Sequence, residues 1–331
     1  MSLKFRTFGK TDVGLVRSGN EDYLHIDEKN GVVGVCDGMG GHQAGEVASM
    51  SASQTLQGIF DHFQKEIRDD PRLGFQQNVP ISGDILLRAV RLANREIYNR
   101  AALDPALSGM GTTIVALSLE KDIVSVAHVG DSRAYKIVDG RVEALTEDHS
   151  WIAEIQRSQT VTSDEAASMV GKNVITRALG VRDTVEVDFR AFKIKPGDRF
   201  MLCSDGLCGF ADDDEISEVV YKCGDDNQQV VDNLVQMAND RGGADNVTIA
   251  VVEVDEVEES AYWDVEVFTL PAETSVELQA EDDWLEKIRT HSPEKEDEAA
   301  EDKDSGGRSS LIWIFVIFVI VAIVVIYYST K

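Results

Sequence analysis

Four aspartates beside glycine or asparagine, at the borders of predicted strands, are the residues of this sequence best suited to chemistry. They are Asp37, Asp131, Asp205 and Asp245. Carboxylates that converge at strand ends would repel one another unless cations lay between them. Oxygen ligands alone favour Mg²⁺ or Mn²⁺ over zinc. Two such ions, about 3.5–4 Å apart, can generate a hydroxide near neutral pH and hold a phosphoryl group.

The first of these aspartates lies in the stretch around which the chain is organised, GVVGVCDGMGGH at 31–42. The apolar run at 32–36 predicts a buried strand that ends at Asp37. The glycines that follow allow the backbone to approach a ligand closely, and a helix is predicted from about Gln43. The alternative is a tight strand-to-helix turn in which Asp37 only caps the helix.

A second polar group precedes this stretch, in the turn-like segment SGNED. Asp22 ends the segment, and Arg17 comes directly before it. The fork-shaped, permanently charged guanidinium of Arg17 suits a phosphate better than a lysine would. The alternative is an ordinary surface ion cluster of Arg17, Glu21 and Asp22, which is the usual fate of such charges.

The elements that must position these residues follow from periodicity. Apolar residues at helical spacing predict helices over about 56–67 and 85–97. The segments that follow are rich in β-formers and joined by short turns, including the hairpin signal Asp139-Gly140, so they are mostly antiparallel. The further predicted strands are 112–119, 123–129, 133–138, 142–145, 185–194, 200–203 and 247–254, and the further predicted helices are 212–221 and 228–238.

Composition excludes several classes of function. The net charge of −27 argues against binding nucleic acid through its phosphates. The four cysteines lack C-x-x-C spacing, and three of them lie in or beside apolar runs. They are therefore expected to be reduced residues of a cytosolic domain rather than zinc ligands. Residues 1–14 contain no continuous apolar segment, so no secretory signal is expected.

The C-terminal part of the sequence differs from the rest. Residues 255–310 are strongly acidic and are expected to form a disordered linker, with a short helix or docking motif at 283–288. Residues 311–328 form an apolar run of 18 residues, which as a helix spans roughly 27 Å. This predicts a single-pass transmembrane anchor with the remaining chain in the cytoplasm. A buried core helix is disfavoured because the run has no polar face, and a GPI signal because no secretory signal is visible.

Eight short motifs occur in a fixed order. They are RSGNED (17–22), DGMGGH (37–42), GMGTT (109–113), VGDSRAY (129–135), TEDHSW (146–151), NVITRALG (173–180), CSDGL (203–207) and GADNVT (243–248). Each motif alone is weak, but the ordered set resembles the type 2C family of metal-dependent protein phosphatases, in its bacterial single-domain form. The resemblance covers about residues 5–254.

The resemblance implies an α+β fold: a β-sandwich of two mainly antiparallel sheets flanked by helix pairs. Residues 1–254 would be the catalytic domain, with a flap at about 148–180 that shapes substrate access. Two Mg²⁺ or Mn²⁺ ions would bind at one end of the sandwich, with a third, weaker site beside them.

The resemblance also implies roles for individual residues. Asp37 would bridge the two ions, the Gly38 carbonyl would be a further ligand, and Asp205 and Asp245 would bind one ion. Asp131, with Asp205, would serve the third site. Asp22 would hold a metal-bound water, and Arg17 would bind the substrate phosphate. Glu21 and Asn246 would lie behind the ligands and contact them.

One position departs from the family pattern. Some members carry histidine directly after the Asp-Gly pair, where it can protonate the leaving alkoxide. Here that position is Met39, and the nearest histidine is His42. Either His42 or a metal-bound water is expected to donate the proton. The alternative is that His42 is only a residue at the start of a helix.

The expected function is hydrolysis of phosphoserine and phosphothreonine in proteins by in-line attack of a metal-bound hydroxide. The substrates would be phosphorylated proteins at the membrane, including a receptor-type serine/threonine kinase. One alternative is a catalytically inactive relative that binds phosphoproteins or serves as a scaffold at the membrane. Another is a cation-binding structural module with no reaction.

Overall fold

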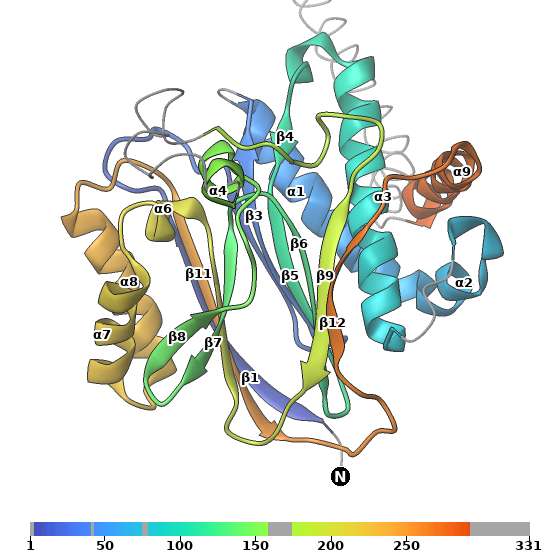
Figure 1. Ribbon diagram of the computed structural model, residues 1–331. Coiled ribbons are helices and arrows are strands. Elements are labelled where there is room, and N and C mark those ends of the chain that lie inside the picture. Colours follow the sequence, from blue (N-terminus) through green and yellow to red (C-terminus); the bar gives the residue numbers. More distant parts are fainter. Residues whose placement is uncertain (1–2, 41–42, 75–78, 158–173, 292–331) are drawn as a thin grey trace, which may run out of the picture. The chain divides into compact units, whose positions relative to one another are not determined.

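The computed structural model describes residues 3–40, 43–74, 79–157 and 174–291 (Figure 1). The chain divides into two units after Leu285, and the architecture below is that of the first unit. The expected class is confirmed: two antiparallel sheets lie between helices.

The smaller sheet has the strand order β1-β11-β10-β7-β8, and the larger has β12-β9-β6-β5-β3-β2 with the short β4 paired to β3. Every pairing is antiparallel. The strands are β1 Lys4–Asp12, β2 Asp22–Asp27, β3 Val32–Met39, β4 Gly111–Thr112, β5 Ile114–Glu120, β6 Ile123–Val129, β7 Arg133–Val138, β8 Arg141–Ala144, β9 Val187–Lys193, β10 Arg199–Cys203, β11 Val247–Glu256 and β12 Val265–Leu270.

Helices cover the outer face of each sheet (Figure 1). Helices α1 and α3 contact strands of the larger sheet, and α7 and α8 contact strands of the smaller one. The helices are α1 Gln43–Gly58, η1 Ile59–Phe63, α2 Gln64–Asp69, η2 Pro71–Leu73, α3 Ile81–Leu103, η3 Pro105–Leu107, α4 Trp151–Arg157, α6 Asp205–Cys208, α7 Asp213–Cys223, α8 Asn227–Asp240 and α9 Ser275–His291.

Strand β11 shows how the sequence builds two apolar layers at once. Successive side chains of a strand point to opposite faces of its sheet. Val247, Ile249 and Val251 accordingly join the cluster that packs under α7 and α8. Ala250 and Val252 join the cluster between the two sheets. A continuous apolar run therefore makes a strand that is buried on both faces.

The expectation of a disordered linker from residue 255 is wrong for its first part. Strand β12 pairs with β9, where Phe268 lies opposite Phe189 with ring centroids 5.4 Å apart. Helix α9 follows and buries Ala280, Trp284 and Leu285. Acidic residues of this segment are paired rather than solvated: the Asp282 carboxylate lies 2.7 Å from the Arg95 guanidinium.

The sequence held a signal for this helix. Thr274 and Glu277 form a capping box, in which the Thr274 N–H donates to Glu277 Oε2 at 2.8 Å and the Glu277 N–H donates to Thr274 Oγ1 at 3.4 Å. Within the described ranges, no helix is long and apolar enough to cross a bilayer. The apolar run at 311–328 lies outside those ranges, as does the end of the acidic segment.

Trp284 provides a test of whether α9 belongs to the folded domain. Trp284 is 3% exposed, and its ring lies edge-on to Phe63 with centroids 5.7 Å apart. Its Nε1–H donates a hydrogen bond to Asp70 Oδ2. We expect Trp284→Ala to lower the free energy of unfolding by about 3–5 kcal/mol in urea titrations. Val276→Ala is the control, since Val276 is 61% exposed on the same helix. If both substitutions had equal, small effects, this segment would be a linker and not part of the folded domain.

Candidate active site

The antiparallel pairing gathers the predicted residues at one end of the sheets. Asp22 begins β2 and lies opposite Asp37 in the register of β3. Asp131 follows β6, Asp205 follows β10, and Asp245 precedes β11. A pocket of about 620 Å³ forms at this end. Its lining includes Arg17, Glu21, Asp37, Gly38, Met39, Asp131, Asp205, Asp245 and Asn246.

One of the predicted residues, Asp22, is not part of this lining. Asp22 is buried behind the pocket, where its Oδ2 accepts a hydrogen bond from Ser204 Oγ at 2.8 Å. His42, the candidate proton donor, lies outside the described residues, so that role stays a prediction. It would be tested by comparing the losses of rate on phosphoserine and on p-nitrophenyl phosphate in His42→Ala.

The carboxylates of the pocket oppose one another's ionisation. Burial, together with the charges of Asp22 and Asp205, raises the pKa of Asp37 well above its usual range. Burial raises the pKa of Asp22 to about 7. Burial and the charges of Asp205 and Asp148 raise the pKa of Asp131 to about 7. A cation placed among these oxygens would lower all three pKa values.

The donor set fits hard divalent cations. The pocket offers carboxylate oxygens and glycine backbone, and Asp22 Oδ1 is a buried oxygen without a hydrogen-bond partner among the described residues. Arg17 is the only cationic side chain among the described residues that line the pocket, and its Nη2 lies 2.8 Å from Asp245 Oδ2. One guanidinium cannot neutralise this many carboxylates, so the site is built for added positive charge.

Glycine is required where the pocket wall is most tightly packed. A Cβ at Gly38 would overlap the carbonyl oxygens of Gly45 and Glu21, and a Cβ at Gly206 would overlap the Asn246 carbonyl. The Gly38 N–H also donates to Glu21 O at 3.1 Å. Gly38 thus lets β3 approach α1 and the loop before β2 closely, and Gly206 lets α6 approach the segment before β11.

Polar side chains behind the aspartates fix the loops. Asn246 Oδ1 accepts from the Glu21 N–H at 2.8 Å, and its Nδ2 donates to Val13 O and Gly19 O at 3.0 and 2.9 Å. Sequence reasoning placed Asn246 behind the ligands but missed Thr113, whose Oγ1 accepts from the Asp37 N–H at 3.0 Å. The motif GMGTT contains Thr113 and was the available signal.

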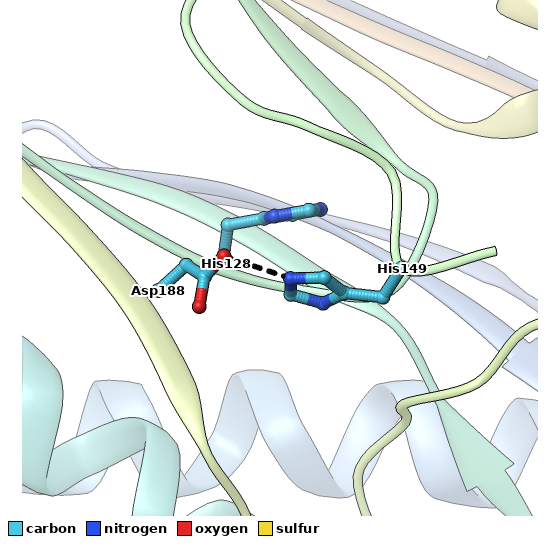
Figure 2. Close-up of side chains that lie close together, drawn as sticks. All are labelled: His128, His149 and Asp188. Carbon is cyan, nitrogen blue, oxygen red and sulfur yellow. Dashed lines mark hydrogen bonds and ion pairs between the residues drawn. The ribbon is translucent and has the colours of Figure 1, made fainter. Parts of the chain in front are cut away.

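A histidine cluster borders the same end of the larger sheet. His128, His149 and Asp188 have ligand-type atoms within 4.8 Å of one another (Figure 2). His149 Nε2 lies 2.9 Å from Asp188 Oδ2, and its Nδ1 accepts from the Gly130 N–H at 3.0 Å. Since Nδ1 accepts, a neutral His149 carries its proton on Nε2 and donates it to Asp188. Burial lowers the pKa of His128 to about 3, so its ring is neutral.

This cluster already contains a positive charge. Arg177 Nη1 donates to Asp188 Oδ1 at 2.9 Å and lies 3.1 Å from His149 Nε2. The His149 N–H donates to Gly130 O at 2.8 Å, and His149 O accepts from the Thr176 N–H at 2.8 Å. His149 therefore ties the loop that carries Asp131 to the segment around Thr176. Sequence reasoning assigned no role to His128, His149 or Asp188.

A family model described as protein phosphatase 2C matches residues 16–246. The chain belongs to this family. A serine/threonine phosphatase named stp from Listeria innocua is 35% identical over 247 residues, which cover 74% of this chain and 94% of that protein.

Solved structures of the family agree with the fold. The Mycobacterium tuberculosis serine/threonine phosphatase PstP is 31% identical, covers 76% of this chain and 99% of its own, and superposes with a TM-score of 0.65. A structure of the PstP catalytic domain in complex with two manganese ions is 32% identical, covers 77% of this chain and all of its own, and gives a TM-score of 0.64.

The family assignment confirms the function expected from the motifs: this protein is a metal-dependent phosphoprotein phosphatase. The two alternatives without a reaction, an inactive relative and a structural module, are set aside. The site also retains the acidic residues that such an alternative would be expected to lack.

The raised pKa values predict how metal affects stability. A carboxyl group whose pKa is about 3.9 in the unfolded chain and about 7 in the folded chain destabilises the fold as pH rises through that interval. Divalent cations compete with these protons. We therefore expect Mn²⁺ to raise the melting temperature more at pH 8 than at pH 6, measured by calorimetry. A Mn²⁺-induced shift in melting temperature of the same size at both pH values would contradict this electrostatic description.

Proposed function

We propose that Asp37 bridges two Mg²⁺ or Mn²⁺ ions, with the Gly38 carbonyl as a further ligand and Asp205 and Asp245 on one ion. Asp131, together with Asp205, serves a third, weaker site. The observation that carries this assignment is the convergence of these groups in one pocket where burial and mutual repulsion raise the pKa of several of them.

When bound, the ions supply a hydroxide near neutral pH and neutralise charge on the phosphoryl group. The chain's own residues orient the reactants. Arg17 lies in the pocket wall with a half-exposed side chain, so its guanidinium can hold two phosphate oxygens of the substrate. Asp22 lies behind Asp37, where it can accept a hydrogen bond from water in the site. Met39 adds an apolar wall beside them.

Asp37→Asn and Asp205→Asn test the ligand assignment. Each substitution keeps the side-chain shape and relieves repulsion, so the fold should survive while turnover of p-nitrophenyl phosphate falls by more than tenfold at saturating Mn²⁺. Asp214→Asn is the control, because Asp214 is exposed on α7 and lies outside the active-site pocket. Activity within tenfold of wild type in either active-site variant would refute the two-ion assignment.

We further propose that residues 311–328 anchor the protein to a membrane, with the phosphatase domain in the cytoplasm. The support is the length of the apolar run and the aromatic residues Trp313, Tyr327 and Tyr328 near its ends. Anchoring would raise the effective concentration of phosphorylated membrane proteins, including a receptor-type kinase.

Deleting residues 311–331 tests the anchor. We expect the truncated protein to move from the membrane fraction to the soluble fraction, to keep its rate on p-nitrophenyl phosphate, and to act more slowly on a membrane-resident phosphoprotein in cells. Ile320→Asp should reproduce the change in fractionation, whereas Val321→Leu should not. A full-length protein that is soluble without detergent would rule the anchor out.

A further inference from the structure

A second cavity, of about 540 Å³, adjoins the active-site pocket. Met39 and Ile175 line both, so these two side chains form the wall between them. This volume is typical of pockets that enclose a drug-sized ligand, roughly 300–1,000 Å³. A group in this cavity would therefore lie next to a phosphoryl group held in the active site.

The cavity combines apolar groups with two cationic groups and one carboxylate, that of Glu186. Its apolar lining includes Val181, Val185 and Ala272, and its cationic groups are Arg177 and Arg182. Val181 is 56% exposed, which leaves an apolar side chain open to a ligand at the cavity edge. Carboxylates dominate the active-site pocket, and the chain has a net charge of −27. The two guanidinium groups beside that pocket therefore differ in sign from the negative charge of the pocket and of the chain as a whole.

The segment beyond the family match helps to build this cavity. Ala272 lies after residue 246, where the match ends, and forms part of the wall. Glu273, whose side chain is fully buried, accepts the Val185 N–H on Oε2 at 2.8 Å and faces Arg91 at 3.5 Å. The turn between β12 and α9 thus holds the backbone of the cavity wall in place.

The same segment also orients one of the two arginines. Thr269 Oγ1 of β12 donates to Asp188 Oδ1 at 2.7 Å, and Asp188 accepts from Arg177 at 2.9 Å. Burial opposes ionisation of Asp188, but the hydrogen bonds from His149 and Thr269 outweigh it and lower the pKa of Asp188. Arg177 is therefore fixed by a carboxylate that stays charged.

The two arginines differ in whether their charge is already paired within the protein or is open to a ligand. Arg177 is paired with Asp188 and lies 3.4 Å from Glu186. Arg182 is exposed, and no ion pair involves it in the part of the chain that the structure describes. An anionic group entering the cavity would thus meet an uncompensated guanidinium at Arg182, whereas the charge of Arg177 is already balanced.

We propose that this cavity binds the stretch of substrate polypeptide next to the phosphorylated residue. An apolar side chain of the substrate packs on Val181 and Ala272, and an acidic side chain pairs with Arg182. The inference rests on the proposed function, because it places the phosphorylated residue in the aspartate pocket. It makes β12 and α9 part of substrate selection as well as part of the fold.

Phosphothreonine peptides that differ at one flanking position, with Glu, Ala or Lys in turn, test the proposal. We expect the wild type to prefer Glu over Ala at one flanking position by about two- to fivefold in kcat/KM, mainly through KM, as for an exposed ion pair. Arg182→Glu should reverse the order in favour of Lys. Arg141→Glu is the matched control, since Arg141 is exposed, begins β8 and pairs with Val138, at the end of β7 far from Asp131.

Filling the cavity is the second arm. Ala272→Trp should raise KM for every peptide by roughly tenfold and leave kcat/KM for p-nitrophenyl phosphate within twofold, because that substrate has no flanking polypeptide for the cavity to bind. Melting curves show whether Ala272→Trp folds. If it does not fold, the peptide preferences of Arg182→Glu alone test the proposal. Peptide preferences that Arg182→Glu and Arg141→Glu leave equally unchanged would overturn the proposal. If the wild-type protein did not hydrolyse p-nitrophenyl phosphate at all, the proposed function would be overturned instead.

Discussion

Mutual repulsion among half-buried carboxylates is the constraint on which the rest of this structure depends. Asp37, Asp131 and Asp205 are held close together although burial and their own charges oppose ionisation. Rigid strands, glycine contacts and Asn246 keep them there. The folded chain is thus prepared for divalent cations before they bind, and binding relieves a repulsion that folding creates.

The domain extends further along the chain than the family match. β12 adds an edge strand beside β9, and α9 packs its apolar side while pairing acidic residues with arginines of α3. The same addition contributes Ala272 to a cavity that shares a wall with the active site. One segment therefore supplies both stability and a surface next to the chemistry, and the two contributions can be separated by substitutions at Trp284 and Ala272.

Much of this was predictable because it rests on local pattern. The hairpin signal Asp139-Gly140, with φ of 49° and 77°, correctly joins β7 to β8, and the strand at 123–129 has the expected bounds. Convergence of the aspartates could not be derived from spacing, since it depends on sheet order. Strand β1 was missed because its half-buried face carries little periodicity. β12 was missed, and α9 was predicted only as a short helix at 283–288, because acidic composition masked the strand and the capped start of the helix.

The binding of Mn²⁺ itself tests the central claim most directly. Titration of the metal-free protein, followed by electron paramagnetic resonance, counts the ions and reports whether two of them lie close enough to couple magnetically. The account predicts that two Mn²⁺ ions bind per chain as a spin-coupled pair and that Asp37→Asn abolishes the coupling. A single uncoupled ion at saturation, or a coupled pair that persists in Asp37→Asn, would contradict it.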